Sequence, residues 1–162
     1  MKITAQEEYG LRCLLQLAQT DAEKGLTVGE IARREGLSHA YVEKLLRLLS
    51  RSGLIHSTRG VKGGYLLNRN PHAINLGEVV RALGSVLSTQ EICDRFTGNR
   101  STCIHIDNCC IRSAWATLTQ KIESFLDTTY LTDLIGVEAK AKQLLNQRMS
   151  APVQFPLNRI RG

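Results

Sequence analysis

The sequence from Thr27 to Leu67 reads TVGEIARREGLSHAYVEKLLRLLSRSGLIHSTRGVKGGYLL. Thr27 followed three residues later by Glu30 is the pattern of a capping box, so we expect a helix to begin here. Gly36 permits the left-handed backbone that ends a helix, and Ser38 can cap the helix that follows. Two short helices separated by so tight a turn predict a helix-turn-helix.

The second of these helices has one apolar face and one face left for contact outside the domain. Four apolar residues recur at steps of three and four before the helix ends near Arg51, so this face packs: Val42, Leu45, Leu46 and Leu49. Helix-turn-helix proteins insert the start of this helix into the DNA major groove. We therefore expect Ser38, His39, Tyr41, Glu43 and Lys44 to contact DNA. Glu43 can accept a hydrogen bond from a cytosine amino group, while Ser38 and Tyr41 can bind phosphate.

A wing follows directly, with short strand-like runs at residues 54–58 and 65–68. The loop between them contains Arg59 and Lys62, which we expect to meet phosphate or enter a minor groove. Gly63 and Gly64 allow a tight reversal and a close backbone approach to DNA. Any hairpin can have a basic, glycine-rich loop, but a wing directly after a helix-turn-helix is much more specific for DNA binding.

Charge and composition agree with a polyanionic partner. The 162-residue chain has a formal charge of +6. Residues 33–62 contain seven basic residues and two acidic ones, which is an electrostatic footprint for nucleic acid.

We find no phosphate loop, paired catalytic carboxylates or nucleotide motif, so we do not expect an enzyme. No signal peptide and no apolar run of about 20 residues is present, which predicts a cytoplasmic protein without membrane contact.

The remaining chain predicts a mainly α fold with a small β-wing, a winged helix-turn-helix joined to a long dimerisation helix. We assign residues 1–88 to the DNA-binding domain, 89–110 to a cysteine-bearing loop, 111–149 to the dimerisation helix and a C-terminal helical segment, and 150–162 to a flexible tail.

Thr4 and Glu7 form a second capping box, for a first helix through about Gln19. Its expected buried stripe is Leu11, Leu14, Leu15 and Ala18, with Cys13 as a small buried hydrophobe beside it. On the long helix, Ala114, Leu118, Ile122, Phe125 and Leu126 keep a helical period beside Trp115, which predicts a dimer seam.

Four of the five cysteines lie in the cysteine-bearing loop, at positions 93, 103, 109 and 110. Structural zinc sites have pairs of cysteines two to four residues apart, and no such pair exists here. The adjacent Cys109 and Cys110 cannot easily reach the same metal. An iron–sulfur cluster, zinc and a thiol redox switch are all compatible with four cysteines in a cytosolic protein, and the spacing alone does not separate them.

Over residues 1–135 the chain resembles the IscR/NsrR-type winged-helix regulators, bacterial transcription factors that sense through an iron–sulfur cluster. This resemblance implies a bacterial, nucleoid-associated protein. The resemblance is carried by the following motifs: EYGLR from Glu8, SHAYVE from Ser38, RGxxGGY from Arg59, Cys103-x5-Cys109, Ala114-Trp115 and YLTDL from Tyr130. It implies a homodimer on a palindromic double-stranded operator, and a four-iron or two-iron cluster bound by Cys93, Cys103 and Cys109.

Two departures from this family concern the cluster. Nine residues separate Cys93 from Cys103, more than the family usually has. The histidine ligand of the IscR branch corresponds to Arg112, and a guanidinium has no lone pair to offer a metal. The NsrR branch instead has an aspartate at the position of Glu8, so we expect Glu8 of the partner subunit as the fourth ligand, ahead of His105 and Cys110.

The sequence therefore predicts a dimeric repressor controlled by a cluster that responds to nitric oxide, redox state or iron. The alternative is a DNA-binding regulator of the same fold without a cluster, controlled by thiol oxidation, zinc, a small molecule or a partner protein.

Overall fold

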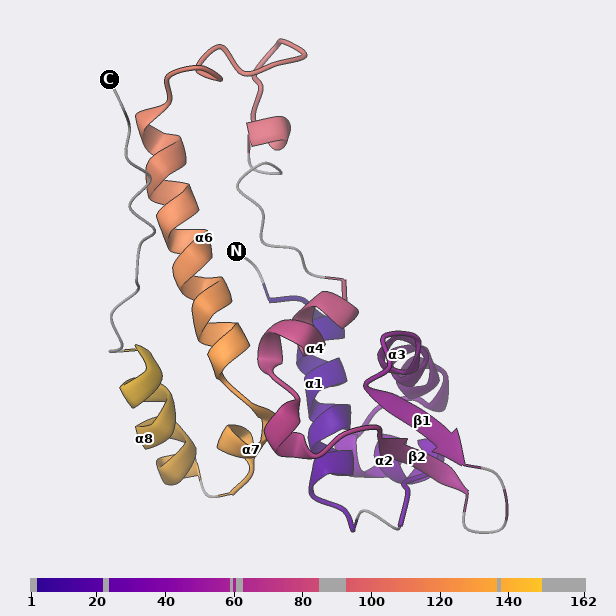
Figure 1. Ribbon diagram of the computed structural model, residues 1–162. Helices are drawn as coiled ribbons and strands as arrows, with labels where there is room; N and C mark the ends of the chain where they lie inside the picture. Colours follow the sequence, from indigo (N-terminus) through magenta and orange to yellow (C-terminus); the bar gives the residue numbers. More distant parts are fainter. Residues whose placement is uncertain are drawn as a thin grey trace.

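Figure 1 shows a computed structural model of the chain, which describes residues 3–21, 24–58, 60, 63–84, 93–136 and 138–149. The elements are α1 (Ala5–Ala18), α2 (Val28–Glu35), α3 (His39–Arg51), β1 (Ile55–Thr58), β2 (Gly64–Leu67), a 3-10 turn (Pro71–Ala73), α4 (Leu76–Ala82), α6 (Cys110–Thr128), α7 (Leu131–Leu134) and α8 (Glu138–Met149). The predicted fold class, mainly helical with a two-stranded wing, is confirmed.

One hydrophobic core lies where α1, α2, α3, α4 and the wing meet. The four residues predicted to form the packing face of α3 are all fully buried in it. On α1 the predicted stripe was partly wrong. Cys13, Leu14 and Leu17 are buried, whereas Leu11, Leu15 and Ala18 are half-buried. The cause is Gly10, where a β-carbon would lie 2.5 Å from the Leu83 side chain, so α1 presses this face against the end of α4.

The wing is an antiparallel pair in which Ile55 faces Leu67 and Thr58 faces Gly64. A third segment pairs with it, because Leu26 exchanges two backbone hydrogen bonds with Tyr65, at 3.1 and 2.8 Å. Leu26 directly precedes the capped start of α2. This bridge therefore ties the wing to the helix-turn-helix.

Helix α6 begins far from the core, at the loop, and its C-terminal end lies beside the core (Figure 1). None of its residues is buried within the chain. After α6 ends, Leu76 N donates to Thr129 O at 2.8 Å and Leu131 N donates to Ile74 O at 3.0 Å. Leu131 is fully buried in the core, so the C-terminal segment completes the packing of the winged-helix domain.

At the base of α6, Arg81 Nη2 of α4 donates to Asp127 Oδ1 at 2.8 Å. The predicted C-terminal helical segment is observed as α8, which contacts both α6 and α7. The proposed division near residue 88 and the tail at 150–162 lie outside the described residues. None of the helices in the described part of the chain is long and apolar enough to cross a lipid bilayer.

Candidate nucleic-acid interface and cysteine loop

The helix-turn-helix is built by the caps that its sequence predicts. Thr27 Oγ1 accepts from Glu30 N at 3.2 Å, and the Glu30 carboxylate accepts from Thr27 N at 2.8 Å. Gly36 adopts a left-handed φ of 68° after α2. Ser38 Oγ accepts from Tyr41 N at 3.3 Å and starts α3. Short-range hydrogen bonds thus fix where α2 begins and where α3 begins, and Gly36 ends α2 between them.

The first turns of α3 present most of the predicted DNA-binding side chains to solvent. Ser38, His39, Glu43 and Lys44 are exposed. Tyr41 is half-buried, because its ring packs edge-on against Tyr9 of α1, with the two ring centroids 6.1 Å apart. Tyr41 therefore has a packing role besides the phosphate contact predicted for it.

A polar network that the sequence did not reveal joins α1 to α2. Glu35, whose side chain is only 6% exposed, accepts from Arg12 Nε at 2.6 Å and from Gln16 Nε2 at 2.5 Å. The hydrogen bond to Glu35 raises the pKa of Arg12, and the guanidinium carbon lies 5.4 Å from the centre of the Tyr9 ring. Arg12 and Gln16 precede Glu35 by 23 and 19 positions, so no local spacing rule could have predicted these contacts.

The tip of the wing is only partly described. Arg59 and Lys62 lie outside the described residues, and their contact with DNA stays a prediction. Gly63 N donates to Gly60 O at 2.8 Å, which closes the hairpin turn. At Gly64 a β-carbon would lie 2.9 Å from the backbone carbonyl of Leu26, so this glycine is required for packing inside the domain.

The cysteine loop stands at the end of α6 that points away from the winged-helix domain (Figure 1). Cys93 lies in a single helical turn at residues 93–95, within the segment predicted to be a loop. Cys93, Cys103 and Cys109 are half-buried and Cys110 is exposed. Cys109 Sγ accepts from Arg112 N at 3.3 Å and caps α6, which begins at Cys110.

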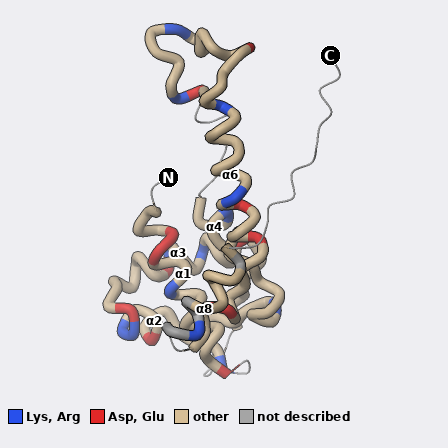
Figure 2. Tube along the Cα trace, turned by 90° about the vertical axis from the view of Figure 1, so that its left-hand side faces the viewer, with Lys and Arg blue, Asp and Glu red and all other residues tan. Residues whose placement is uncertain are grey.

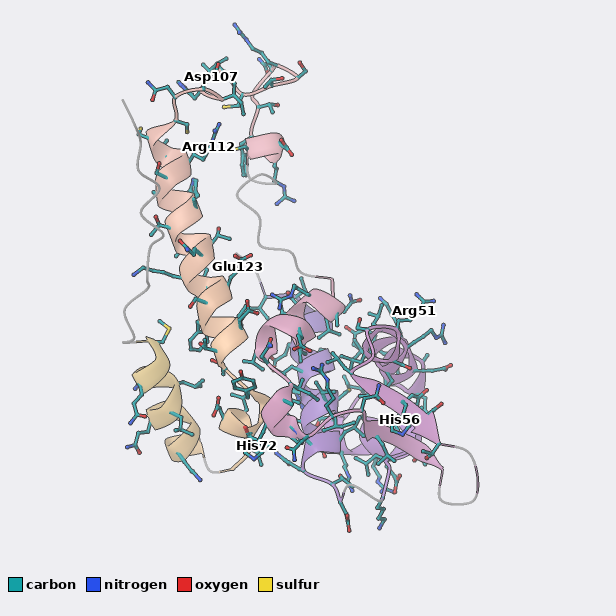
Figure 3. The ribbon with its side chains drawn as sticks, in the orientation of Figure 1. Arg51, His56, His72, Asp107, Arg112 and Glu123 are labelled. Atoms are coloured by element: carbon teal, nitrogen blue, oxygen red, sulfur yellow. The ribbon has the colours of Figure 1, made fainter. Side chains whose placement is uncertain are left out.

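Arg112 connects α6 to the loop. Figure 3 shows it on the first turn of α6, below the loop that carries Asp107. Its Nη2 donates to the carbonyl oxygen of Ile106, while its Nε is buried without a hydrogen-bond partner among the described residues. Arg112 thus holds the loop against the helix.

The thiols suit iron by chemistry, since soft sulfur donors favour iron–sulfur clusters. A helix N-terminus also favours a negatively charged ligand at Cys109. However, no three His, Cys, Asp or Glu side chains of the described residues are gathered around one point. Glu8 is exposed on α1, in the winged-helix domain, and His105 is exposed on the loop. The fold of one chain therefore does not bring Glu8 to its own cysteines (Figure 1).

A capped helix-turn-helix followed by a wing that is tied back to it defines a winged-helix DNA-binding protein. Residues 3–136 match the model of the Rrf2 family, described as "Iron-dependent Transcriptional regulator". The chain belongs to the Rrf2 family, a family of transcriptional regulators and not of enzymes.

Individual relatives agree with this assignment. The chain is 36% identical to the Rrf2 protein of Nitratidesulfovibrio vulgaris over 135 residues, covering 83% of this chain and 87% of that protein. It is 31% identical to the regulator IscR of Pectobacterium atrosepticum over 146 residues, covering 90% and 84%. The solved structure of CymR, the global cysteine regulator of Bacillus subtilis, superposes with a TM-score of 0.68 at 30% identity, covering 83% of this chain and 95% of that one.

Proposed function

We propose that this regulator is a homodimeric repressor whose binding to a palindromic operator is controlled by an iron–sulfur cluster on the cysteine loop. The observation that carries the proposal is the placement of Cys93, Cys103 and Cys109. Three half-buried thiols share one loop, and the third caps the helix that leads back to the DNA-binding domain. Helix α6 contacts α4, and α4 contacts the recognition helix α3, so a change at these sulfurs could reach α3 through α4.

The dimer follows from the apolar surface of α6. Ile111, Trp115 and Leu118 are 60%, 44% and 47% exposed and follow one another at helical steps of four and three. The half-buried Ile122 and Phe125 continue the same stripe towards the core. Few charged residues interrupt α6, which is largely uncharged in Figure 2. Pairing of two such helices about a two-fold axis would present two α3 helices to the two half-sites of a palindrome.

In this proposal Cys93, Cys103 and Cys109 bind the cluster, and Glu8 of the partner subunit supplies the fourth ligand. The cluster, when bound, supplies iron that reacts with nitric oxide or oxygen. Arg112 has no lone pair for iron, but its bond to the Ile106 carbonyl orders the backbone between Cys103 and Cys109. At the other end of the chain, α3 and the wing bind DNA through Ser38, His39, Glu43 and Lys44, and through Arg59 and Lys62 at the wing tip.

A second candidate is control by thiol chemistry without a cluster. It is favoured by the absence of a gathered ligand set among the described residues and by the exposed Cys110 next to Cys109. The similar structure of CymR is that of a global cysteine regulator, which agrees with a signal carried by sulfur compounds.

Measurement of iron, acid-labile sulfide and visible absorbance on protein purified without oxygen tests the proposal. We expect matched iron and sulfide in the wild type, loss of both in Cys103→Ala, and retention in Cys13→Ala, which removes a thiol outside the loop. Operator binding is then compared before and after exposure to nitric oxide. A metal-free protein that releases DNA only when its thiols are oxidised would overturn the cluster and favour the second candidate.

A further inference from the structure

Two oppositely charged side chains on the exposed face of α3, Glu43 and Arg47, form an ion pair, and Arg47 is not among the DNA-binding candidates named above. Glu43 Oε1 accepts from Arg47 Nη2 at 2.9 Å, and the two side chains are 55% and 61% exposed. The residues are one helical turn apart. Val42 and Leu46, each next to one of them in sequence, are fully buried and fix the rotation of the helix, so the pair faces outward.

An isolated carboxylate on this basic face of α3 would oppose DNA binding. The other charged residues of α3 are Lys44, Arg47 and Arg51, all basic and exposed. Glu43 is the one acid in the helix, and near phosphates its charge would repel the duplex. The ion pair with Arg47 offsets this charge while the carboxylate stays on the surface that enters the groove.

Both groups retain hydrogen-bonding capacity for base edges. Glu43 has a second carboxylate oxygen, and a guanidinium has five N–H donors, of which this pair uses one. In the major groove a carboxylate accepts from the amino group of cytosine, and an arginine fork donates to O6 and N7 of guanine. The paired atoms are 2.9 Å apart, close to the spacing of about 3.4 Å between stacked base pairs, so the spacing of the two groups matches that of neighbouring base pairs.

We infer that Glu43 and Arg47 act as one unit that reads two successive G·C pairs in each half-site. Arg47 binds guanine and at the same time positions the Glu43 carboxylate against the adjacent cytosine. This inference deepens the proposed function, since it rests on α3 being the recognition helix. The simpler role of the pair is to stabilise the helix surface, where such i,i+4 pairs contribute little.

The experiment is a selection of bound duplexes from a random-sequence library by the full-length protein, metal-free and after cluster reconstitution. Anisotropy titrations of the enriched duplex follow, with each G·C pair replaced in turn by A·T. The variants are Arg47→Ala, Arg47→Lys and Glu43→Gln, with Lys44→Ala as the matched control on the same exposed face. Arg47→Lys keeps the charge but not the fork, so it separates base reading from general attraction.

For the wild type we expect two adjacent G·C positions at which an A·T replacement weakens binding roughly ten- to hundredfold. Arg47→Ala should reduce that discrimination to a few-fold at both positions, Arg47→Lys chiefly at the guanine and Glu43→Gln chiefly at the cytosine. Lys44→Ala should weaken binding to every duplex alike and make the salt dependence shallower.

An Arg47→Ala protein that selects the wild-type sequence with unchanged base preferences would overturn the inference and leave the regulator function intact. If the wild type itself enriches no sequence, the inference and the proposed operator binding fall together. Thermal unfolding of each variant confirms that the comparison is made on folded protein.

Discussion

Gly64 at the start of β2 lies directly against the backbone of Leu26, which precedes α2. A β-carbon on Gly64 would stand 2.9 Å from the carbonyl carbon and from the carbonyl oxygen of Leu26. Backbone atoms cannot rotate away as a flexible side chain can, and the two Leu26–Tyr65 hydrogen bonds hold them in place. The position of the wing relative to the helix-turn-helix therefore depends on the absence of a side chain at this residue.

Gly64→Ala should consequently push the wing away from Leu26. We expect a loss of about 1–3 kcal/mol in the free energy of unfolding from the overpacking, measured by urea denaturation. DNA affinity should fall as well, because the wing tip no longer lies beside the groove entered by α3. Ser57→Ala, an exposed substitution on β1 opposite Tyr65, is the control and should change neither quantity. Wild-type stability and affinity in Gly64→Ala would contradict this account.

Cys13 should behave differently from the cysteines of the loop. It is fully buried in α1, and burial raises the pKa of its thiol from 9.0 to about 11. Because the thiolate is the nucleophile, we expect Cys13 to stay unmodified by iodoacetamide at about pH 8 in the native metal-free protein. Cys110 is exposed and should react first. Mass spectrometry of the alkylated peptides measures the extent of modification at Cys13 and at Cys110. Labelling in denaturant provides the reference for full modification. Native modification of Cys13 at the rate of Cys110 would show that α1 opens readily.

The capping box of α2 should make stability depend on pH. Hydrogen bonds from the backbone and side chain of Thr27 lower the pKa of Glu30 below its ordinary value of 4.5. A carboxylate whose pKa is lowered on folding stabilises the protein above its unfolded pKa, and this contribution is lost as pH falls through the lowered value. Glu30→Gln cannot titrate. The difference in unfolding free energy between wild type and Glu30→Gln should stay constant from about pH 7 to about pH 5, then shrink below 4.5.

Ser38→Ala is the control for this pH series, because it removes the cap of α3 without removing a titratable group. Glu30 is present in both wild type and Ser38→Ala, so their difference in unfolding free energy should stay constant while Glu30 titrates. A Glu30→Gln difference that stays constant down to about pH 3 would show that the ionised carboxylate has no special stabilisation in the folded state.

The elements that the sequence predicted well are those defined by local chemistry. Thr27 with Glu30, Gly36 and Ser38 form their caps through contacts within a few residues, and each was predicted from spacing alone. The burial of Leu45 and Leu49 followed from helical periodicity in the same way. Such signals need no knowledge of the distant parts of the chain.

Contacts between distant segments were not predicted. The rotation of α1 depends on Gly10 meeting Leu83, a residue 73 positions later in the sequence. The burial of Leu131 in the winged-helix core depends on a hydrogen bond to Ile74 after the whole of α6 has passed. For the cysteine loop, spacing identified the thiols, but which of them share a ligand depends on tertiary and quaternary placement that spacing does not specify.

The proposed dimer can be followed through the single tryptophan of the chain. Trp115 is 44% exposed on α6, between the exposed Ile111 and Leu118. If two α6 helices pair along this stripe, the indole becomes shielded from water in the dimer. We expect its emission to shift to longer wavelength as the protein is diluted, in step with the mass measured by sedimentation. Leu118→Glu should place a charge in the seam and raise the dimer dissociation constant roughly a hundredfold or more.

Ser124→Glu introduces the same charge at an exposed position of α6 outside the Ile111–Trp115–Leu118 stripe, and it should leave the dissociation constant within a few-fold of the wild type. A protein that stays monomeric at every concentration, or a Leu118→Glu variant that dimerises like Ser124→Glu, would rule out this stripe as the interface. Two-fold symmetric binding of a palindrome would then need another contact surface, because a single winged helix reads one half-site.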